Sequence, residues 1–205
     1  GLGAIAGGKY TTYRVMAADA VDAAANELPI RVQSSITDKV PLLGADGYHA
    51  LVNQADQLAV RHGLHPYRVR HLLDRYGSLI YEVLDLANGR PDLLRPIAEA
   101  PDYLRVEAVY AVTHEGALHL EDVLARRTRI SIEYPHRGTA CADEVAELIA
   151  EPLGWSQQTI KREVELYNAR VTAEREAQQQ PDDEAADKRR RAAPDVRAGV
   201  VVPAG

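Results

Sequence analysis

Residues 6–14 read AGGKYTTYR, two glycines between an apolar run and an alanine-rich segment. The run from Leu2 to Ala6 predicts a strand, and residues 11–26 predict a helix because apolar side chains recur there at helical spacing. Gly7 and Gly8 let the backbone take conformations that other residues avoid, and they let a ligand approach closely. The stretch is therefore typical of a strand, a tight turn and the start of a helix.

This turn has the properties of a site for an anionic or electron-rich ligand. The first N–H groups of a helix have no acceptor within the helix, and the helix dipole is positive at that end. Lys9 adds a full positive charge at the same place, and the hydroxyl of Thr11 or Thr12 can cap the helix. Strand–glycine–helix junctions are also common in α/β proteins, so a purely structural turn is the alternative interpretation.

Two stretches of the chain resemble one enzyme family. Residues 7–22, GGKYTTYRVMAADAVD, closely resemble the signature near the end of the flavin domain in FAD-dependent glycerol-3-phosphate dehydrogenases. Residues 109–115, VYAVTHE, and residues 120–129, LEDVLARRTR, resemble the C-terminal helical domain of the same family. The two motifs stand in the family's order and separation, and the resemblance extends from Leu2 to about Tyr167.

The resemblance implies a mainly α chain, in which a helical C-terminal domain is preceded by the last strand and helix of an FAD-binding α/β domain. Residues 1–33 would end the flavin domain, and residues 34–177 would form the helical domain. The whole enzyme would oxidise sn-glycerol 3-phosphate to dihydroxyacetone phosphate and pass electrons through FAD to a quinone or another acceptor. A cytoplasmic location is expected, and the resemblance leaves open a peripheral contact with the inner face of the membrane or a homodimer.

The resemblance also assigns roles to residues of the turn. The cofactor-binding residues that it implies are Gly7, Gly8, Lys9, Tyr10 and Thr11. Lys9 would in addition attract the phosphate or an oxygen of the substrate, and Arg14 would either reach the substrate or brace the turn. The chain opens inside an expected strand and has no initiator methionine, so we expect a fragment. Catalytic residues are expected in the missing N-terminal FAD domain, and none is assigned here.

Composition bounds the function classes. The chain has 205 residues, of which 46% are hydrophobic and 26% charged, which are ordinary values for a globular protein. The net charge of −6 argues against a general nucleic-acid surface, and the single cysteine, Cys141, rules out an internal disulfide. No apolar run approaches the roughly 18 residues of a membrane span, and no signal-peptide pattern is visible.

Glycines and prolines divide residues 34–177 into short predicted helices. Gly63 and Gly154 are predicted to end two of them, and Trp155-Ser156 to begin the last, which runs to about Ala177. The other predicted helices cover about 48–61, 66–75, 78–87, 118–127 and 139–151, whereas residues 103–114 fit either a helix or a short strand. Residues 178–205 are charged and have no apolar face, so we predict a disordered tail.

Other motifs compete weakly with this interpretation. His114 and His119 are five residues apart rather than four, which places them on different sides of a helix, so no metal site is predicted. Residues 146–170 resemble a helix-turn-helix, although Glu163 and Glu165 would face phosphates badly. Two alternatives are therefore kept, a stand-alone helical interaction domain and a helix-turn-helix DNA-binding regulator.

Overall fold

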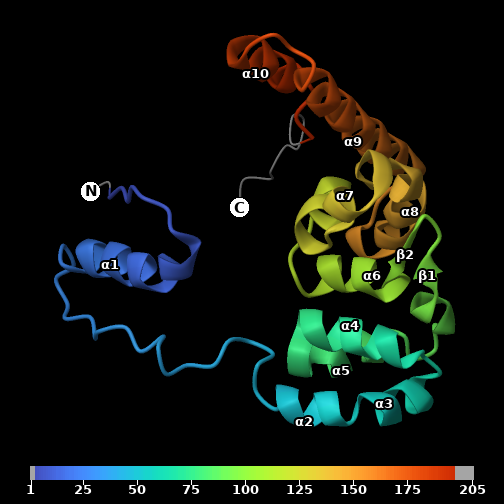
Figure 1. Ribbon diagram of the computed structural model, residues 1–205, viewed down its shortest axis with the longest axis horizontal. Coiled ribbons are helices and arrows are strands. Elements are labelled where there is room, and N and C mark those ends of the chain that lie inside the picture. Colours follow the sequence, from blue (N-terminus) through green and yellow to red (C-terminus); the bar gives the residue numbers. More distant parts are fainter. Residues whose placement is uncertain (1–2, 197–205) are drawn as a thin grey trace.

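The computed structural model describes residues 3–196, in which helices predominate (Figure 1). An N-terminal unit comes first: an irregular segment over residues 3–9, a 3-10 turn over Tyr10–Thr12 and helix α1 over Tyr13–Ala25. Residues 26–47 then run as turns and irregular chain to the next helix. Figure 1 shows α1 apart from the other helices, and its main contacts among the described residues are with the preceding 3-10 turn.

A helical domain begins at Tyr48, and its elements follow in chain order. Its first layer holds α2 (Tyr48–Asn53), α3 (Ala55–His62), α4 (Pro66–Tyr76), a 3-10 turn (Gly77–Leu79) and α5 (Ile80–Asp85). A second 3-10 turn (Pro91–Leu94) leads into an antiparallel hairpin of β1 (Pro96–Ile97) and β2 (Ala100–Leu104). The chain continues through α6 (Arg105–Thr113), a π-helical turn (Asp122–Arg127), α7 (Ile130–Glu133), a 3-10 segment (Pro135–Cys141), α8 (Ala142–Leu153), α9 (Gln157–Ala177) and α10 (Asp183–Arg191).

Helix α6 lies at the centre of the helical domain, between the layer of α4 and α5 and the layer of α7 and α8 (Figure 1). Val106 and Val109 of α6 pack with the apolar side chains of α2 to α5. Ala108 and Ala111, on its other face, pack with those of α8 and α9. Because its two faces belong to different apolar clusters, α6 joins those clusters into one domain. Burying each side chain of valine size contributes about 1.5–3 kcal/mol to its stability.

Several helix boundaries follow the predicted local signals. Gly63 and Gly154 end α3 and α8 in the left-handed conformation, both at φ 64°, which residues with a Cβ adopt only with strain. Ser156 begins α9 by accepting a hydrogen bond from the backbone N–H of Thr159 at 3.1 Å. The predicted helical C-terminal domain is confirmed, with its helices beginning at Tyr48, and residues 105–113 of the ambiguous segment are helical.

The start of the chain differs from the expectation. Residues 3–9 form no strand, because a strand needs a neighbour for its backbone groups and the described chain offers none here. The two short strands β1 and β2 lie elsewhere, at residues 96–104. Residues 1–2, the beginning of the predicted strand, lie outside the described residues.

Two further segments differ from their predicted form. The helix predicted over 118–127 begins at Leu120 and is π-helical over Asp122–Arg127, and the Asp122 carboxylate accepts the N–H groups of Leu118 and His119 just before it. The disordered tail predicted from residue 178 is wrong for α10, which is capped by Asp182 and packs against α9. Ala186 supplies the small buried contact, and residues 197–205 of the predicted tail lie outside the described residues.

Candidate functional site

The glycine turn before α1 is built by a few local hydrogen bonds. Gly7 has φ 123°, a conformation that glycine adopts readily. The carbonyl of Lys9 accepts both the backbone N–H and the hydroxyl of Thr12, each at 2.9 Å. Thr12 therefore stands at the N-cap of α1 with its hydroxyl turned back to Lys9, and the predicted side-chain cap by Thr11 or Thr12 does not form.

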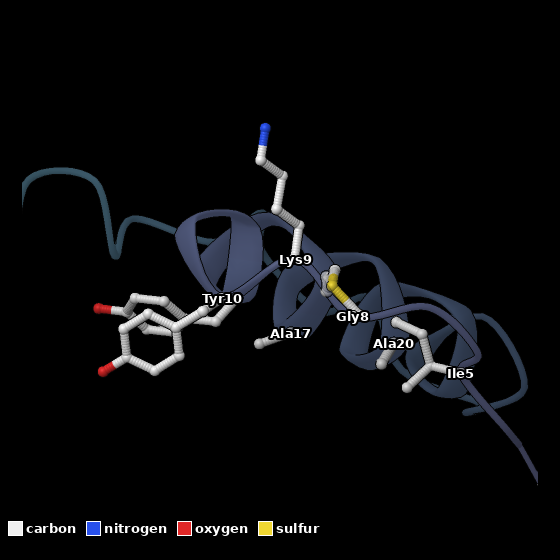
Figure 2. Close-up of a pocket in the computed structure, with 8 residues that line it drawn as sticks. Ile5, Gly8, Lys9, Tyr10, Ala17 and Ala20 are labelled. Atoms are coloured by element: carbon white, nitrogen blue, oxygen red, sulfur yellow. The ribbon is translucent and has the colours of Figure 1, made fainter.

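An open, mainly apolar pocket of about 490 Å³ lies between this turn and one face of α1 (Figure 2). Its lining residues are Ile5, Gly8, Lys9, Tyr10, Tyr13, Met16, Ala17 and Ala20. Figure 2 shows Ile5 beside Ala20 at one end, Tyr10 at the other, and the Lys9 side chain extending away from Tyr10. The rings of Tyr10 and Tyr13 tilt toward each other with centroids 6.0 Å apart.

The charge at the turn is positive. Lys9 is exposed, and the first turn of α1 contains no acidic residue. The N-terminal end of α1 adds its dipole to the ammonium charge. A Cβ added at Gly7 or Gly8 would meet nothing within 4 Å, so the space over the turn is open. An anionic or electron-rich group can therefore approach the backbone of the turn beside Lys9.

The sequence-predicted site residues separate into two groups in space. Gly8, Lys9 and Tyr10 line the pocket together, whereas Arg14 lines a second groove between α1 and residues 33–43. Gly7 and Thr11 belong to the turn without lining the pocket. The cofactor and substrate roles of all six residues stay predictions.

A second polar cluster, which sequence reasoning missed, lies inside the helical domain. The Glu107 carboxylate is fully buried and accepts hydrogen bonds from the Leu104 N–H at 2.8 Å and the Tyr76 hydroxyl at 3.3 Å. His71 Nε2 lies 3.1 Å from it, and Arg75 Nε forms an ion pair at 3.2 Å. These contacts join α4, β2 and α6. The sequence signal for this cluster is Glu107 itself, a single acidic residue within the otherwise apolar run 106–112.

His114, Glu115 and His119 each have different partners and do not form one site. His114 stacks on Tyr110 at 4.6 Å between centroids. Burial raises the pKa of the Glu115 carboxyl, although Arg127 and Arg75 oppose the rise. His119 pairs instead with Glu163 of α9 at 2.9 Å. Within residues 3–196, no group of three or more histidine, cysteine or acidic side chains is placed to hold a metal ion.

Helices α8 and α9 meet at Gly154 in the helix–turn–helix arrangement expected from residues 146–170. Glu163 of α9 is buried, and its second oxygen accepts the N–H of Leu120 at 3.0 Å. Ile160 and Val164 of the same helix are also buried in the core. This face of α9 is therefore used for packing within the domain.

Comparison with known proteins gives a family match over most of the helical domain. Residues 35–160 match the model of the C-terminal domain of alpha-glycerophosphate oxidase. The chain belongs to this family of glycerol-3-phosphate oxidases and dehydrogenases. The family match begins after the glycine turn and α1, and it covers the second half of the linker and the helices up to the first turn of α9.

Relatives match the glycine turn as well. The chain is 66% identical over 203 residues to the glycerol-3-phosphate dehydrogenase of Mycobacterium leprae and to glycerol-3-phosphate dehydrogenase 2 of Mycobacterium tuberculosis. Each match covers 99% of this chain and 35% of the relative. A probable mitochondrial glycerol-3-phosphate dehydrogenase of Dictyostelium discoideum is 32% identical over 165 residues, covering 80% of this chain and 25% of its own. The chain thus spans about a third of the curated relatives.

Proposed function

We propose that this chain is the C-terminal part of an FAD-dependent enzyme that oxidises sn-glycerol 3-phosphate to dihydroxyacetone phosphate. The observation that carries the proposal is the open glycine turn with Lys9 at the start of α1, in a chain whose relatives are named glycerol-3-phosphate dehydrogenases. The substrate is a dianionic phosphate ester with a secondary alcohol. A positive turn beside an open pocket suits such a ligand.

The residues present fit one edge of a flat cofactor ring that gains negative charge when it is reduced. The pocket is mainly apolar, and no side chain stands over Gly7 or Gly8. Gly8 and Tyr10 would line the ring's edge, and the N–H groups at the helix start would stabilise negative charge on it. When bound, FAD supplies the hydride acceptor and passes the electrons to a quinone or another acceptor. The residues of this chain would hold and orient the cofactor ring and neutralise the negative charge on it.

Location and assembly form part of the same proposal. We infer a cytoplasmic enzyme that meets the inner face of the membrane peripherally where its acceptor is a quinone, or that acts as a homodimer. No helix within residues 3–196 is long and apolar enough to cross a membrane.

The direct test uses the full-length protein that carries this chain. We expect it to retain bound FAD after purification and to reduce a dye or quinone with sn-glycerol 3-phosphate. Glycerol without the phosphate serves as the matched control and should react far more slowly. A purified, folded protein with neither flavin absorbance nor turnover would remove the proposal.

The role of Lys9 is tested by Lys9→Ala in the full-length enzyme. A hydrogen bond to a charged group is worth about 1.5–3 kcal/mol, so kcat/KM should fall by roughly one to two decades. Flavin content should change little, because the turn's backbone and not this side chain would hold the ring. Lys161→Ala, which removes an exposed lysine of α9, is the control. An unchanged kcat/KM with full flavin would mean that Lys9 is only a surface residue.

A further inference from the structure

An open groove of the helical domain lies between α9 and the 3-10 segment that precedes α8. Its volume is about 370 Å³, and it is lined by Thr139, Ala140, Asn168, Val171, Thr172 and Arg175. Val171 is only 5% exposed and belongs to the apolar core, so the polar residues stand around an apolar floor. None of these residues takes part in the glycine turn or in the Glu107 cluster.

The polar side chains of this groove are able to donate hydrogen bonds to a ligand. Asn168, Thr172 and Arg175 follow one another at spacings of four and three residues, which places them on one face of α9. Thr139 lines the opposite wall. Within residues 3–196, none of these four side chains forms a hydrogen bond or an ion pair with the protein. Their amide, hydroxyl and guanidinium groups are therefore available to a molecule in the groove.

The groove carries one positive charge and has no acidic lining residue. Arg175 stands between two acids in the sequence of α9, but each of these acids already pairs with another arginine. Glu174 pairs with Arg137 at 3.1 Å, and Glu176 pairs with Arg189 of α10. The guanidinium of Arg175 keeps its five N–H donors, which suit an anion with several oxygens.

The 3-10 wall of the groove is fixed against α9. His136 and Arg137 hold left-handed conformations, at φ 52° and 57°, which residues with a Cβ adopt at a cost. The Tyr167 hydroxyl of α9 donates to the Arg137 carbonyl at 2.6 Å, and Gly138 has no room for a Cβ beside Ile130. Because these contacts hold the two walls together, the groove does not have to form when a ligand binds.

We propose that this groove binds a phosphate group, with Arg175 supplying the charge and the three neutral side chains supplying further donors. A tetrahedral phosphate presents oxygens in several directions and accepts hydrogen bonds from both walls, whereas a planar carboxylate mainly suits the guanidinium. The phosphate belongs to a small phosphate ester or to the headgroup of an anionic lipid, which share this chemistry. The family match ends at residue 160, so Asn168, Thr172 and Arg175 lie beyond it.

The test titrates inorganic phosphate into the isotope-labelled 205-residue chain and follows the backbone amide shifts by NMR. Phosphate replaces sodium chloride at constant ionic strength, so general screening stays the same. We expect saturable shifts at residues 139–140 and 168–175. Shifts at residues 7–12 report binding at the Lys9 turn separately, so this site and the proposed function succeed or fail independently.

Three variants distinguish the groove from a generally positive surface. Arg175→Gln should weaken phosphate binding at the groove by roughly one to two decades, because hydrogen bonds from charged donors are the strong ones. Thr172→Val keeps the shape of the side chain without its hydroxyl and should weaken binding about fivefold. Lys161→Gln, the matched control, removes a positive charge from α9 outside the groove and should leave the affinity unchanged. The thermal melts of all three variants should equal that of the wild type.

Vesicles of phosphatidylcholine with and without phosphatidic acid identify the source of the phosphate. Sedimentation of the chain only with phosphatidic acid, lost in Arg175→Gln, supports the site and names a lipid headgroup. Phosphate binding without sedimentation supports the site and names a small phosphate ester. Groove amides that do not shift with phosphate overturn the proposal. It is also overturned if Lys161→Gln weakens binding as much as Arg175→Gln, because general attraction to a positive helix then explains the binding.

Discussion

Helices α1 and α6 are both rich in alanine and valine, but α1 is exposed to solvent and α6 is buried. α1 contains no buried residue, and Val15 and Val21 are 51% and 61% exposed. α6 buries six consecutive residues, 106–111. The difference teaches that an apolar pattern shows which side chains a helix could bury. Whether they are buried depends on which other elements of the fold pack against that helix.

The largest expected effect is the loss of thermal stability when Glu107, the buried acid of the helical domain, is removed. Glu107→Ala leaves Arg75, His71 and Tyr76 without their shared acceptor inside the core. Removing one partner of a buried ion pair costs about 3–5 kcal/mol, so the thermal melt should fall steeply or be lost. Asp19→Ala, an exposed acid of α1, is the control and should leave the melt unchanged. Equal melts for the two variants would contradict the structural role of Glu107.

A pair of leucines sharpens the same comparison. Leu84 of α5 is 1% exposed, whereas Leu28, which follows α1, is 52% exposed. Leu84→Ala should cost about 2–5 kcal/mol of unfolding free energy in the 205-residue chain. Leu28→Ala should stay within about 0.5 kcal/mol. Urea unfolding followed by circular dichroism measures both, and a large loss for Leu28→Ala would show that the N-terminal unit folds as part of the same core.

Local signals predicted much of the fold. Gly63, Gly154 and Ser156 act on their own helix ends, so their roles can be inferred from neighbouring residues alone. The same applies in hindsight to α10, where Asp182 provides the cap and residues 188–191 place positive charge in the last turn. The tail prediction failed because it weighed the missing apolar face and overlooked these end signals.

Non-local features could not be predicted from the chain. Residues 103–114 were ambiguous because a helix buried on all sides loses the polar face that marks its period. The close approach of the Gly44 and Gly77 backbones and the donors around Glu107 join segments far apart in the sequence. At the candidate site, Gly8 and Lys9 were proposed together from the sequence and line one pocket, whereas the position of Arg14 in another groove depends on the path of residues 33–43.

The smallest expected effect is a loss of stability at alkaline pH, confined to the helical domain. The Tyr103 hydroxyl donates to Glu133 at 2.8 Å and accepts the N–H of Arg129 at 3.1 Å. Burial and the bond to Glu133 raise the pKa of Tyr103 to about 12. Tyr110 and Tyr134, which donate to Glu82 and Asp102, have their pKa raised to about 12 for the same reasons.

Stability decreases as the pH rises because the fold favours the neutral form of the phenol. A pKa near 10 in the unfolded chain and about 12 in the fold means that the tyrosines' contribution is complete below pH 10 and is lost as the pH rises toward 12. The melting temperature of the 205-residue chain should therefore decline between those values. Tyr103→Phe should lower it at pH 8 by the loss of about 1 kcal/mol of hydrogen bonding, yet flatten the alkaline decline. A decline equally steep in Tyr103→Phe would show that ionisation of Tyr103 plays no part, because that variant has no phenol left to titrate at this position.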